Sequence, residues 1–549
     1  MKQSTNHLPH IFDIAPAITN NQLLYGDNLT VMRTMPNACV DLIYLDPPFN
    51  SQRNYNIIYE KVTGQPVPEQ EEAFCDAWEM DAEKEEMARR MPIVLRDYGV
   101  DEDLVLFWKA WIDALRHTQP RLLAYLIYMS YRLFEMRRIL KPTGSIYLHC
   151  DPTASHYIKV ILDGVFGHQN FRNEIVWKRT LPHGNVRQMF GRAHDVILFY
   201  SKGKTSTWNQ QFEAHKQQYV DKFYRFTDPE TSRRYRLVSC INPNPNRPNL
   251  TYEWNGITKV WKWTRDRMKE AHDKGLLVYS RTGIPSYKNY LDEMKGTPMQ
   301  DIWEGLAPIM GSSPERLGYP TQKPSALLKR IIAASSNEGD VIFDPFCGCG
   351  TAIYAAHLLG RKWIGCDIAI LSVRLVRDVL LKRYGLVEDK DYEISGIPLS
   401  VEGAEDLFDR DPRQFQHWAV ELAGGFSSTK TTGDKGIDGR IHFETEGSKL
   451  KNMVLSVKGG KLSPVFMREL RGTVDREESD TKMGGFICLQ NPTKGMKEEA
   501  ASAGVYTYLG KDYDRLQIRT IQDLLDGRGF DTPSKVPTLG WQNQIVMPI

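Results

Sequence analysis

The stretch Val341-Ile342-Phe343-Asp344-Pro345-Phe346-Cys347-Gly348-Cys349-Gly350-Thr351 decides the fold of this 549-residue chain. Its first three residues predict a strand, the glycines that follow predict a tight turn, and residues 351–359 predict a helix. Glycines at 348 and 350 allow a positive φ and let the backbone approach a ligand closely. Strand, glycine turn and helix together are the start of an α/β unit.

The next predicted strand, residues 363–366, ends at Asp367, 17 residues after Gly350. In nucleotide-binding folds an acidic side chain at about that distance accepts hydrogen bonds from ribose hydroxyl groups, so the spacing favours a nucleoside ligand. The turn lacks the phosphate-loop pattern and is shorter than the dinucleotide fingerprint. Taken alone it could equally be a tight structural turn, and Cys347 and Cys349 are interpreted as small residues that fill it.

Outward from this turn, strands and helices alternate along most of the chain. Apolar patterns predict strands at 40–45, 145–149, 175–177 and 195–200, and helices at 121–140 and 325–335. This alternation predicts a doubly wound α/β fold with a mostly parallel sheet. Residues 219–248 are basic, aromatic and rich in Asn-Pro turns, which predicts irregular structure. After about residue 400 the pattern restarts, which indicates a further domain with a helix at 413–422 and a strand at 453–458.

Composition excludes several classes of protein. The hydrophobic fraction of 41% is ordinary for a globular protein. No apolar run reaches the roughly 18–20 residues that span a bilayer, because Arg132 interrupts the best candidate, residues 122–133. The N-terminus lacks the pattern of a secretory signal, so a cytoplasmic protein is expected. The eight cysteines are scattered, apart from Cys347 and Cys349, which argues against a disulfide scaffold or a structural zinc site.

The net charge of +2 is unevenly distributed. Residues 171–280 contain 20 Lys and Arg against 10 Asp and Glu, a local charge of +10. Residues 60–105 contain 5 against 14, a local charge of −9. The basic segment suggests contact with a polyanion, although a solvated surface of mixed charge would look the same.

The strand at 40–45 ends in Asp46-Pro47-Pro48-Phe49, a group suited to one particular reaction. Methylation of an exocyclic amine requires acceptors for the amine protons, because the nitrogen lone pair is otherwise delocalised into the ring. Asp46 and the Pro47 carbonyl could be these acceptors, with prolines fixing the direction of the carbonyl groups. The Phe49 ring could stack on a base that is flipped out of a duplex. The alternative is a simple turn, since this tripeptide is also a common breaker.

The chain as a whole resembles the amino-methylating DNA methyltransferases, over nearly all of residues 20–400. Asp46-Pro47-Pro48-Phe49 is similar to their catalytic motif, and residues 344–351 are similar to their S-adenosylmethionine motif. Thr321-Gln322-Lys323-Pro324 is similar to the segment around the methionine end of the cofactor. Gly26-Asp27-Asn28 is similar to the element near the adenine ring. The catalytic motif comes first, which is the circularly permuted order of the beta group.

The resemblance implies the remaining site residues. Cofactor-binding residues would be the following: Asp27, Thr321, Gln322, Lys323, Asp344, Phe346, Gly348, Gly350 and Asp367. Target recognition would lie between the two halves, where arginines alternate with aromatic residues and would contact double-stranded DNA: Arg225, Arg233, Arg234 and Arg236. Each aromatic in that region is more simply explained by core packing, and Trp261 and Trp263 are expected to share one face of a strand.

Two features of the catalytic motif bear on the substrate. Phe49 stands where many members of the family have Tyr, and stacking survives that change because the ring remains. Aspartate at position 46 favours adenine N6 over cytosine N4, whose enzymes more often have Ser there. No metal ion is expected for the transfer, because the sulfonium already supplies the electrophile. Members of the group are often dimers, so a homodimer is left open.

Residues 401–549 resemble Mrr-type restriction endonucleases in one segment. Asp438 would bind a metal ion and Lys458 would activate water, so Mg²⁺ would be needed if this domain cuts DNA. Ser456 departs from the pattern where an acidic or amide side chain is expected, and Gln416 occupies the place of a first-helix Glu. Fewer carboxylates weaken magnesium binding. A fold that binds DNA or packs on the methyltransferase without cutting is the alternative.

The predicted division is therefore a catalytic half at 1–170, a recognition region at 171–300, a cofactor half at 301–400 and an endonuclease-like domain at 401–549. The leading hypothesis is a site-specific adenine-N6 DNA methyltransferase that acts in host modification or in a restriction–modification system. The alternatives are an N4-cytosine enzyme, a single chain that both modifies and cleaves, and a DNA-binding protein with vestigial motifs. An RNA or protein-glutamine methylase is disfavoured, since those usually have Asn at the position of Asp46.

Overall fold

The computed structural model describes residues 20–48, 78–150, 154–180, 190–306, 308–309, 313, 315–317, 322–427, 436–445, 449–476 and 480–533. The chain divides into two compact units, of which the smaller comprises Gln210–Gln300 and the larger the rest.

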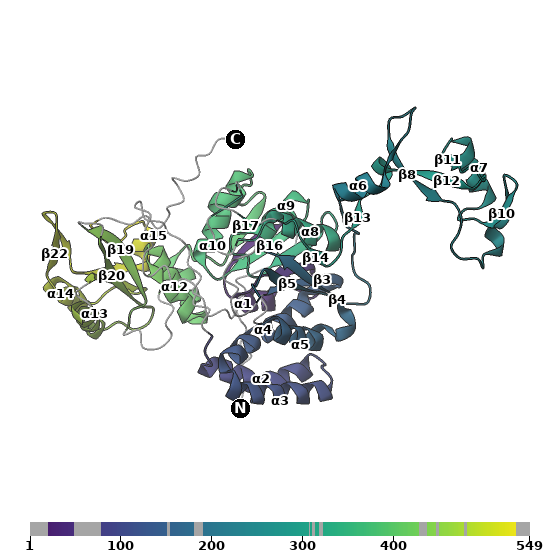
Figure 1. Cartoon of the computed structure of the whole chain (residues 1–549). Helices are drawn as coiled ribbons and strands as arrows, with labels where there is room; N and C mark the ends of the chain where they lie inside the picture. The colour runs from purple at the N-terminus through teal and green to yellow at the C-terminus, as the bar shows by residue number, and fades with distance from the viewer. Residues whose placement is uncertain are drawn as a thin grey trace. The chain divides into compact units, whose positions relative to one another are not determined.

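A nine-stranded sheet lies at the centre of the larger unit (Figure 1). In spatial order its strands are β14 (Ile302–Trp303), β4 (Phe171–Lys178), β5 (His194–Ser201), β3 (Leu140–Cys150), β2 (Val40–Leu45), β15 (Val341–Asp344), β16 (Lys362–Asp367), β1 (Asn21–Tyr25) and β17 (Tyr392–Ser395). Strand β5 runs antiparallel to its neighbours β3 and β4, and the other described pairs are parallel. This confirms the predicted α/β fold with a mostly parallel sheet.

Helices cover both faces of the sheet because its central strands are apolar on both sides. Leu24 and Ile43 enter one core and their neighbours Leu23 and Leu42 enter the other. The first core is built with α1 (Asn28–Thr34), α2 (Ala82–Asp97), α3 (Glu102–Thr118), α4 (Pro120–Ile139) and α5 (Ser155–Phe166). The second is built with α8 (Ser325–Ser335), α9 (Thr351–Leu358), α10 (Ile370–Leu375) and the π-helical turn Val376–Leu381 that continues it.

The catalytic and cofactor motifs meet in the middle of this sheet. Strands β2 and β15 are parallel neighbours, with Leu42 paired to Ile342 and Ile43 to Phe343. Their carboxyl ends therefore lie at the same edge, which is where open α/β sheets bind ligands. The pairing joins segments that are about 300 residues apart in sequence.

The smaller unit is more regular than the sequence suggested. It contains α6 (Gln217–Phe223), α7 (Arg265–Asp273), β6 (Phe212–Glu213), β7 (Phe226–Thr227), β8 (Arg234–Ser239), β9 (Thr251–Trp254), β10 (Ile257–Val260), β11 (Leu277–Tyr279), β12 (Pro285–Tyr290) and β13 (Thr297–Pro298). The expectation of irregular structure at residues 219–248 was wrong for β7 and β8, because β8 gains a distant partner, β12.

Trp261 and Trp263 do not lie on a common strand, although both belong to one small core. Trp261 forms only an isolated bridge with Ile241 and is fully buried, and its indole N–H donates to the Tyr252 carbonyl at 2.8 Å. The expected strand was therefore wrong, since the Asn242 N–H pairs with Val260 and the Lys262 N–H with Cys240 in a turn-rich cluster. The recognition region was predicted to start at residue 171, whereas the smaller compact unit starts at Gln210. The residues of β4 and β5, which lie between these two positions, belong to the large sheet.

Residues after 400 form a second sheet, one face of which belongs to the same core as the cofactor half, whereas the other face has a separate core. The strand order is β18 (Phe426–Ser427), β19 (Gly439–Thr445), β20 (Lys449–Lys458), β21 (Thr481–Cys488) and β24 (Leu516–Thr520). The other elements are α11 (Val401–Arg410), α12 (Pro412–Leu422), α13 (Pro464–Arg476), α14 (Lys494–Ser502), α15 (Ile521–Leu525), β22 (Val505–Tyr508) and β23 (Lys511–Asp514). The predicted helix at 413–422 and strand at 453–458 are confirmed as α12 and part of β20. Across the described residues, no helix combines the length and hydropathy needed to cross a membrane.

Candidate functional site

Asp46 follows the last residue of β2 and forms an ion pair with Lys323. Both side chains are largely buried, at 17% and 11% exposure. The Lys323 ammonium contacts Asp46 Oδ2, whereas Asp46 Oδ1 is buried and has no hydrogen-bond partner among the described residues. A buried carboxylate oxygen without a donor costs free energy unless a ligand supplies one. Asp46 therefore has an acceptor available for a substrate.

Asp344 ends β15 beside this pair. It is buried, and its carboxylate accepts a hydrogen bond from the Phe346 N–H at 3.1 Å. Burial raises the pKa of Asp344 well above its ordinary value, and the nearby charges of Asp46 and Asp367 raise it further. A carboxyl group held in its neutral form can donate as well as accept a hydrogen bond.

The glycine turn connects Asp344 to α9 in the predicted conformation. Gly348 and Gly350 have φ of +49° and +79°, in the left-handed region that side chains rarely adopt. A Cβ at Gly350 would lie 2.9 Å from both Leu380 and Val376. Glycine is therefore required there both by the positive φ and by this lack of space. Cys347 and Cys349 are buried, and burial raises the pKa of the Cys349 thiol to about 11. Both fit the role of small residues that fill the turn.

Asp367, at the end of β16, lies against that turn. Its Oδ2 accepts a hydrogen bond from the Gly348 N–H at 2.8 Å and its Oδ1 accepts one from the Ala369 N–H at 2.9 Å. Burial raises the pKa of Asp367 to about 6, although these donors lower it. Each oxygen retains a lone pair, so the carboxylate can also accept hydrogen bonds from a ligand.

Asp27 and Asn28 bring β1 to the same edge. Asp27 caps α1 by accepting from the backbone of Leu29 and Thr30. The Asn28 amide donates to the Pro345 carbonyl at 2.7 Å, which ties β1 to the cofactor turn.

The sequence reasoning missed the role of Arg132. Its guanidinium pairs with Asp27, donates to Asn28 Oδ1 at 2.6 Å and lies over the Tyr128 ring. In the sequence, Arg132 was noted only as an interruption of an apolar run. Its charge within an otherwise apolar helical stretch was the signal that could have identified its role, because buried charges are normally paired.

The remaining predicted cofactor residues differ in their surroundings. Gln322 fixes the preceding loop, since its amide accepts from the Leu317 N–H at 2.7 Å and donates to the Glu315 carbonyl at 2.6 Å. Phe346 is half-buried and packs on the core beneath the sheet. Thr321 and Phe49 lie outside the described residues.

A second buried polar network, also missed, lies beneath the catalytic strand end. The Tyr44 hydroxyl group and His149 Nδ1 are 3.0 Å apart, and His149 Nε2 is 3.2 Å from the Asp195 carboxylate. All three side chains are at most 2% exposed. Arg179 Nε lies 3.0 Å from the other Asp195 oxygen, and hydrogen bonding to His149 lowers the Asp195 pKa. The network fixes Tyr44, two residues before Asp46.

The four arginines proposed for DNA contact differ in how they are engaged. Arg233 forms ion pairs with Asp292 and Glu293 and lies over the Tyr290 ring. Arg234 and Arg236 contact Asp221 and the Tyr219 hydroxyl group, respectively. Arg225 is exposed. These contacts give three of the four an internal partner, and Arg225 is the best placed to bind a ligand.

In the C-terminal domain, the structure shows no group of carboxylates around Asp438 and Lys458 among the described residues. Asp438 Oδ2 accepts from the Val457 N–H at 2.6 Å, and the Lys458 ammonium lies 5.7 Å from the centre of the Phe466 ring. Ser456 is buried on β20, two residues before Lys458. No group of three or more metal-binding side chains occurs within the described part of the chain.

Fold and site together define an α/β protein in which the acidic side chains Asp46, Asp344 and Asp367 gather at the carboxyl ends of adjacent parallel strands. Residues 40–377 match the N6/N4 methyltransferase family, described as DNA methylase. That match covers more than half of the chain, so the chain belongs to the N6/N4 DNA methylase family. Residues 412–526 match a second family, described as NACHT-associated inactive Restriction Endonuclease 1.

Three individual similarities accompany the family match. The Type II methyltransferase M.EcaI of Enterobacter cloacae is 34% identical over 267 residues, which cover 48% of this chain and 58% of the relative. The DNA adenine methyltransferase YhdJ of Escherichia coli K12 is 24% identical over 347 residues, 63% of this chain and 78% of the relative. The crystal structure of the M1.HpyAVI–SAM complex is 14% identical, with 65% of this chain and 98% of that chain covered.

The TM-score of that structural match is 0.29, so the superposition carries no argument about this chain. The similarity to M.EcaI reaches less than two thirds of that relative's length.

Proposed function

We propose that this protein transfers a methyl group from S-adenosylmethionine to adenine N6 in double-stranded DNA, as the modification enzyme of a restriction–modification system. The observation that supports this most strongly is the acceptor arrangement at Asp46. One carboxylate oxygen of Asp46 is paired with Lys323, and the other is buried without a partner among the described residues. The order of the two motifs along the chain supports membership of the permuted beta group.

The residues at the glycine turn fit the cofactor. Asp367 can accept hydrogen bonds from ribose hydroxyl groups, with its carboxylate held by the Gly348 and Ala369 N–H groups. Asp27 would bind near the adenine ring, and Gln322 and Lys323 near the methionine end. When bound, S-adenosylmethionine supplies a methyl group on a sulfonium, which is the electrophile.

The chain's own residues prepare the acceptor nitrogen. Asp46 Oδ1 and the Pro47 carbonyl accept hydrogen bonds from the two amine protons, which directs the nitrogen lone pair away from the ring. Phe49 stacks on the flipped base. With its lone pair directed in this way, the nitrogen would be the nucleophile for the sulfonium methyl group that the bound cofactor would supply, and the amine would lose one proton to water. Lys323 keeps the Asp46 carboxylate paired and oriented throughout.

Aspartate at position 46 supports adenine N6 over cytosine N4, since the cytosine enzymes more often have Ser there. The similarity to an adenine methyltransferase of Escherichia coli supports the same choice. Long-read sequencing of DNA from cells that express the protein would report the modified base, its position and the recognition sequence together. N4-methylcytosine in that DNA would overturn the adenine assignment.

The test of the catalytic role is Asp46→Ala in the full chain, assayed with tritiated S-adenosylmethionine and unmethylated DNA. We expect methyl transfer to be abolished while the cofactor still binds, with Asp97→Ala, an exposed aspartate on α2, as the matched control. Activity of Asp46→Ala within about tenfold of the wild type would contradict the role, because lost transition-state contacts cost at least that much.

The C-terminal domain is proposed to be inactive as a nuclease. Its match to an inactive endonuclease family and the buried Ser456 at the expected ligand position both support this. Incubation of unmethylated plasmid with the protein and Mg²⁺ should leave the plasmid intact. Cleavage that is lost in Lys458→Ala would instead support the enzyme that both modifies and cleaves.

A further inference from the structure

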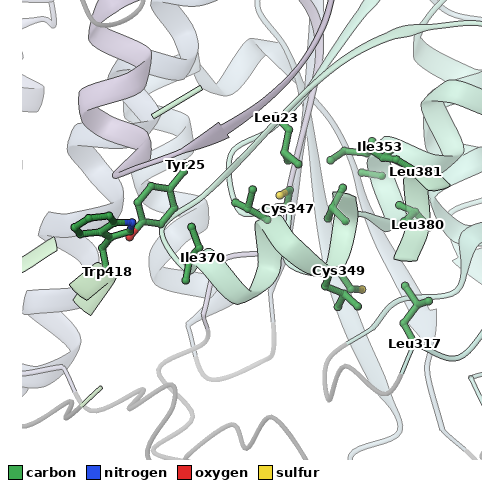
Figure 2. Close-up of a cluster of buried hydrophobic side chains, with 14 of the residues drawn as sticks. Leu23, Tyr25, Leu317, Cys347, Cys349, Ile353, Ile370, Leu380, Leu381 and Trp418 are labelled. Carbon is green, nitrogen blue, oxygen red and sulfur yellow. The ribbon is translucent and has the colours of Figure 1, made fainter. Parts of the chain in front are cut away.

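Helix α12 of the C-terminal domain packs directly on the cofactor half of the methyltransferase (Figure 2). Figure 2 shows Trp418 of α12 beside Tyr25, the last residue of β1, with Ile370 of α10 next to them. Trp418 and Tyr25 are at most 2% exposed and belong to the same continuous core. A buried tryptophan in a shared core makes this a packed junction between the two parts of the chain rather than a loose contact.

Gln414 of α12 reaches the turn that follows β1. Its side chain is 4% exposed, and its amide lies against the Tyr25 hydroxyl group. Gln414 Nε2 would be 3.8 Å from a Cβ placed on Gly26, and the Gly26 N–H donates to the Asp367 carbonyl at 3.0 Å. Gln414 therefore lies close to Gly26, whose N–H is bonded to Asp367.

Glu421, two turns further along α12, reaches the other side of Asp367. Its carboxylate lies close to the Ile370 N–H and to the charges of Arg374 and Asp367. Its Oε2 is buried without a hydrogen-bond partner among the described residues, as is Gln414 Nε2. Burial raises the pKa of Glu421 to about 8. A surface packing residue would not place its polar atoms in this way, because burial without full pairing is costly.

We propose that α12 is a built-in part of the cofactor site, in which Gln414 and Glu421 position the two backbone segments, Gly26–Asn28 and Asp367–Ile370, that surround the nucleoside of S-adenosylmethionine. This inference rests on the proposed function. It gives the endonuclease-like domain a role that needs no nuclease chemistry. Cofactor binding and the docking of α12 then stabilise each other by the same factor, because coupling between two equilibria is reciprocal.

The test uses the full-length chain with Gln414→Ala, Glu421→Ala and the conservative Glu421→Gln, whose amide oxygen can still lie close to the Ile370 N–H. For both alanine variants we expect KM for S-adenosylmethionine to rise roughly tenfold, because the segments around the nucleoside lose a side chain that packs against them. We expect kcat to change less than about threefold, KM for DNA to stay constant, and Glu421→Gln to restore most of the cofactor affinity. Glu405→Ala, which removes an exposed carboxylate from α11, is the matched control.

Calorimetric titration of S-adenosylmethionine separates this inference from the proposed function. If the wild type does not bind the cofactor, the proposed function fails. If the wild type and all three variants bind it equally, only the role of α12 is overturned. A parallel fall in kcat and rise of both KM values, with a lower unfolding temperature, would indicate general structural damage and would also overturn it. Should Glu421→Ala fail to fold, Gln414→Ala and Glu421→Gln decide the question by the same measurements.

Discussion

Lys323 and Asp46 form a largely buried ion pair across 277 residues of sequence. The pair joins the segment before α8 to the end of β2, and it leaves one Asp46 oxygen directed at no described protein donor. An ion pair at this depth is costly to assemble, and removing one partner leaves the other charge uncompensated. Asp344 lies near both charges, so three ionisable side chains gather at the carboxyl ends of β2 and β15.

Replacing Lys323 with methionine should impair methylation and also lower the stability of the fold, because the Asp46 charge is left buried without its partner. Lys323→Met removes the cation that orients Asp46, so we expect the rate at saturating DNA and cofactor to fall by at least about tenfold. Lys323→Arg should retain more activity because the charge remains. Lys109→Met, on an exposed position of α3, is the control. Methyl incorporation by Lys323→Met equal to that of the control would show that the pair has no part in transfer.

Cofactor affinity should depend on pH through Asp367. Its pKa is raised to about 6, so the carboxyl group is mostly ionised at pH 7 and mostly protonated at pH 5. Because ribose hydroxyl groups are bound by the ionised form, Kd for S-adenosylmethionine should rise roughly tenfold from pH 7 to pH 5.

The matched variant for this titration is Asp367→Asn, which should bind the cofactor weakly with little dependence on pH. Glu421, with a pKa of about 8, is predominantly protonated across the same range and so contributes little. Isothermal titration at several pH values measures both proteins. An equally steep pH dependence in Asp367→Asn would assign the titration to another group.

Gly350→Ala should damage both stability and cofactor binding. An alanine at φ +79° is strained, and its Cβ would also collide with Val376 and Leu380 at 2.9 Å. Together these effects predict a loss of about 2–4 kcal/mol in the free energy of unfolding.

Gly339→Ala is the control, since Gly339 has φ of +83° but nothing within 4 Å of the added Cβ. It should lose only about 1–2 kcal/mol, the cost of the backbone strain, and should bind the cofactor normally. Chemical denaturation followed by circular dichroism gives both values. Equal losses in the two variants would mean that contact with the π-helical turn is unimportant.

Arg225 and Arg233 should respond differently to alanine substitution although both lie in the basic unit. Arg225 is exposed, so Arg225→Ala should weaken DNA binding and reduce the slope of log K against log salt by about one. Arg233 is committed to Asp292 and Glu293, so Arg233→Ala should lower the unfolding temperature. Fluorescence anisotropy at several salt concentrations measures the first effect and thermal unfolding the second. A salt slope that is unchanged in Arg225→Ala would exclude phosphate contact by that residue.

The sequence predicted the central strands of the fold well because their pattern is local. Residues 341–343 and 363–366 are largely apolar, short and followed by an aspartate, and the structure contains both within strands. Prediction failed in the basic unit, where β8 and β12 each depend on a partner about 50 residues away. Short polar strands lack a clear alternation of apolar and polar residues, so the sequence does not indicate with which strand they pair.

For the site, the sequence identified single residues with distinctive neighbours, such as Asp46 before two prolines and Gly348 in its turn. It missed Arg132, His149 and Asp195, because each is isolated in the sequence and acquires its meaning only from burial beside another polar group. Within the helix predicted at 413–422 nothing in the sequence distinguished Gln414 and Glu421, since their contacts lie outside the C-terminal domain.

By itself the sequence determined the order of the strands along the chain, the glycine turn, the acidic strand ends and the family. Only the tertiary structure decided which of these ends are adjacent, that Lys323 rather than a nearer residue pairs with Asp46, and that α12 borders the cofactor half. The physical reason is that turns and strands follow from local steric and hydrophobic preferences. Pairing between buried charges depends on which distant segments the folded core brings within hydrogen-bonding distance.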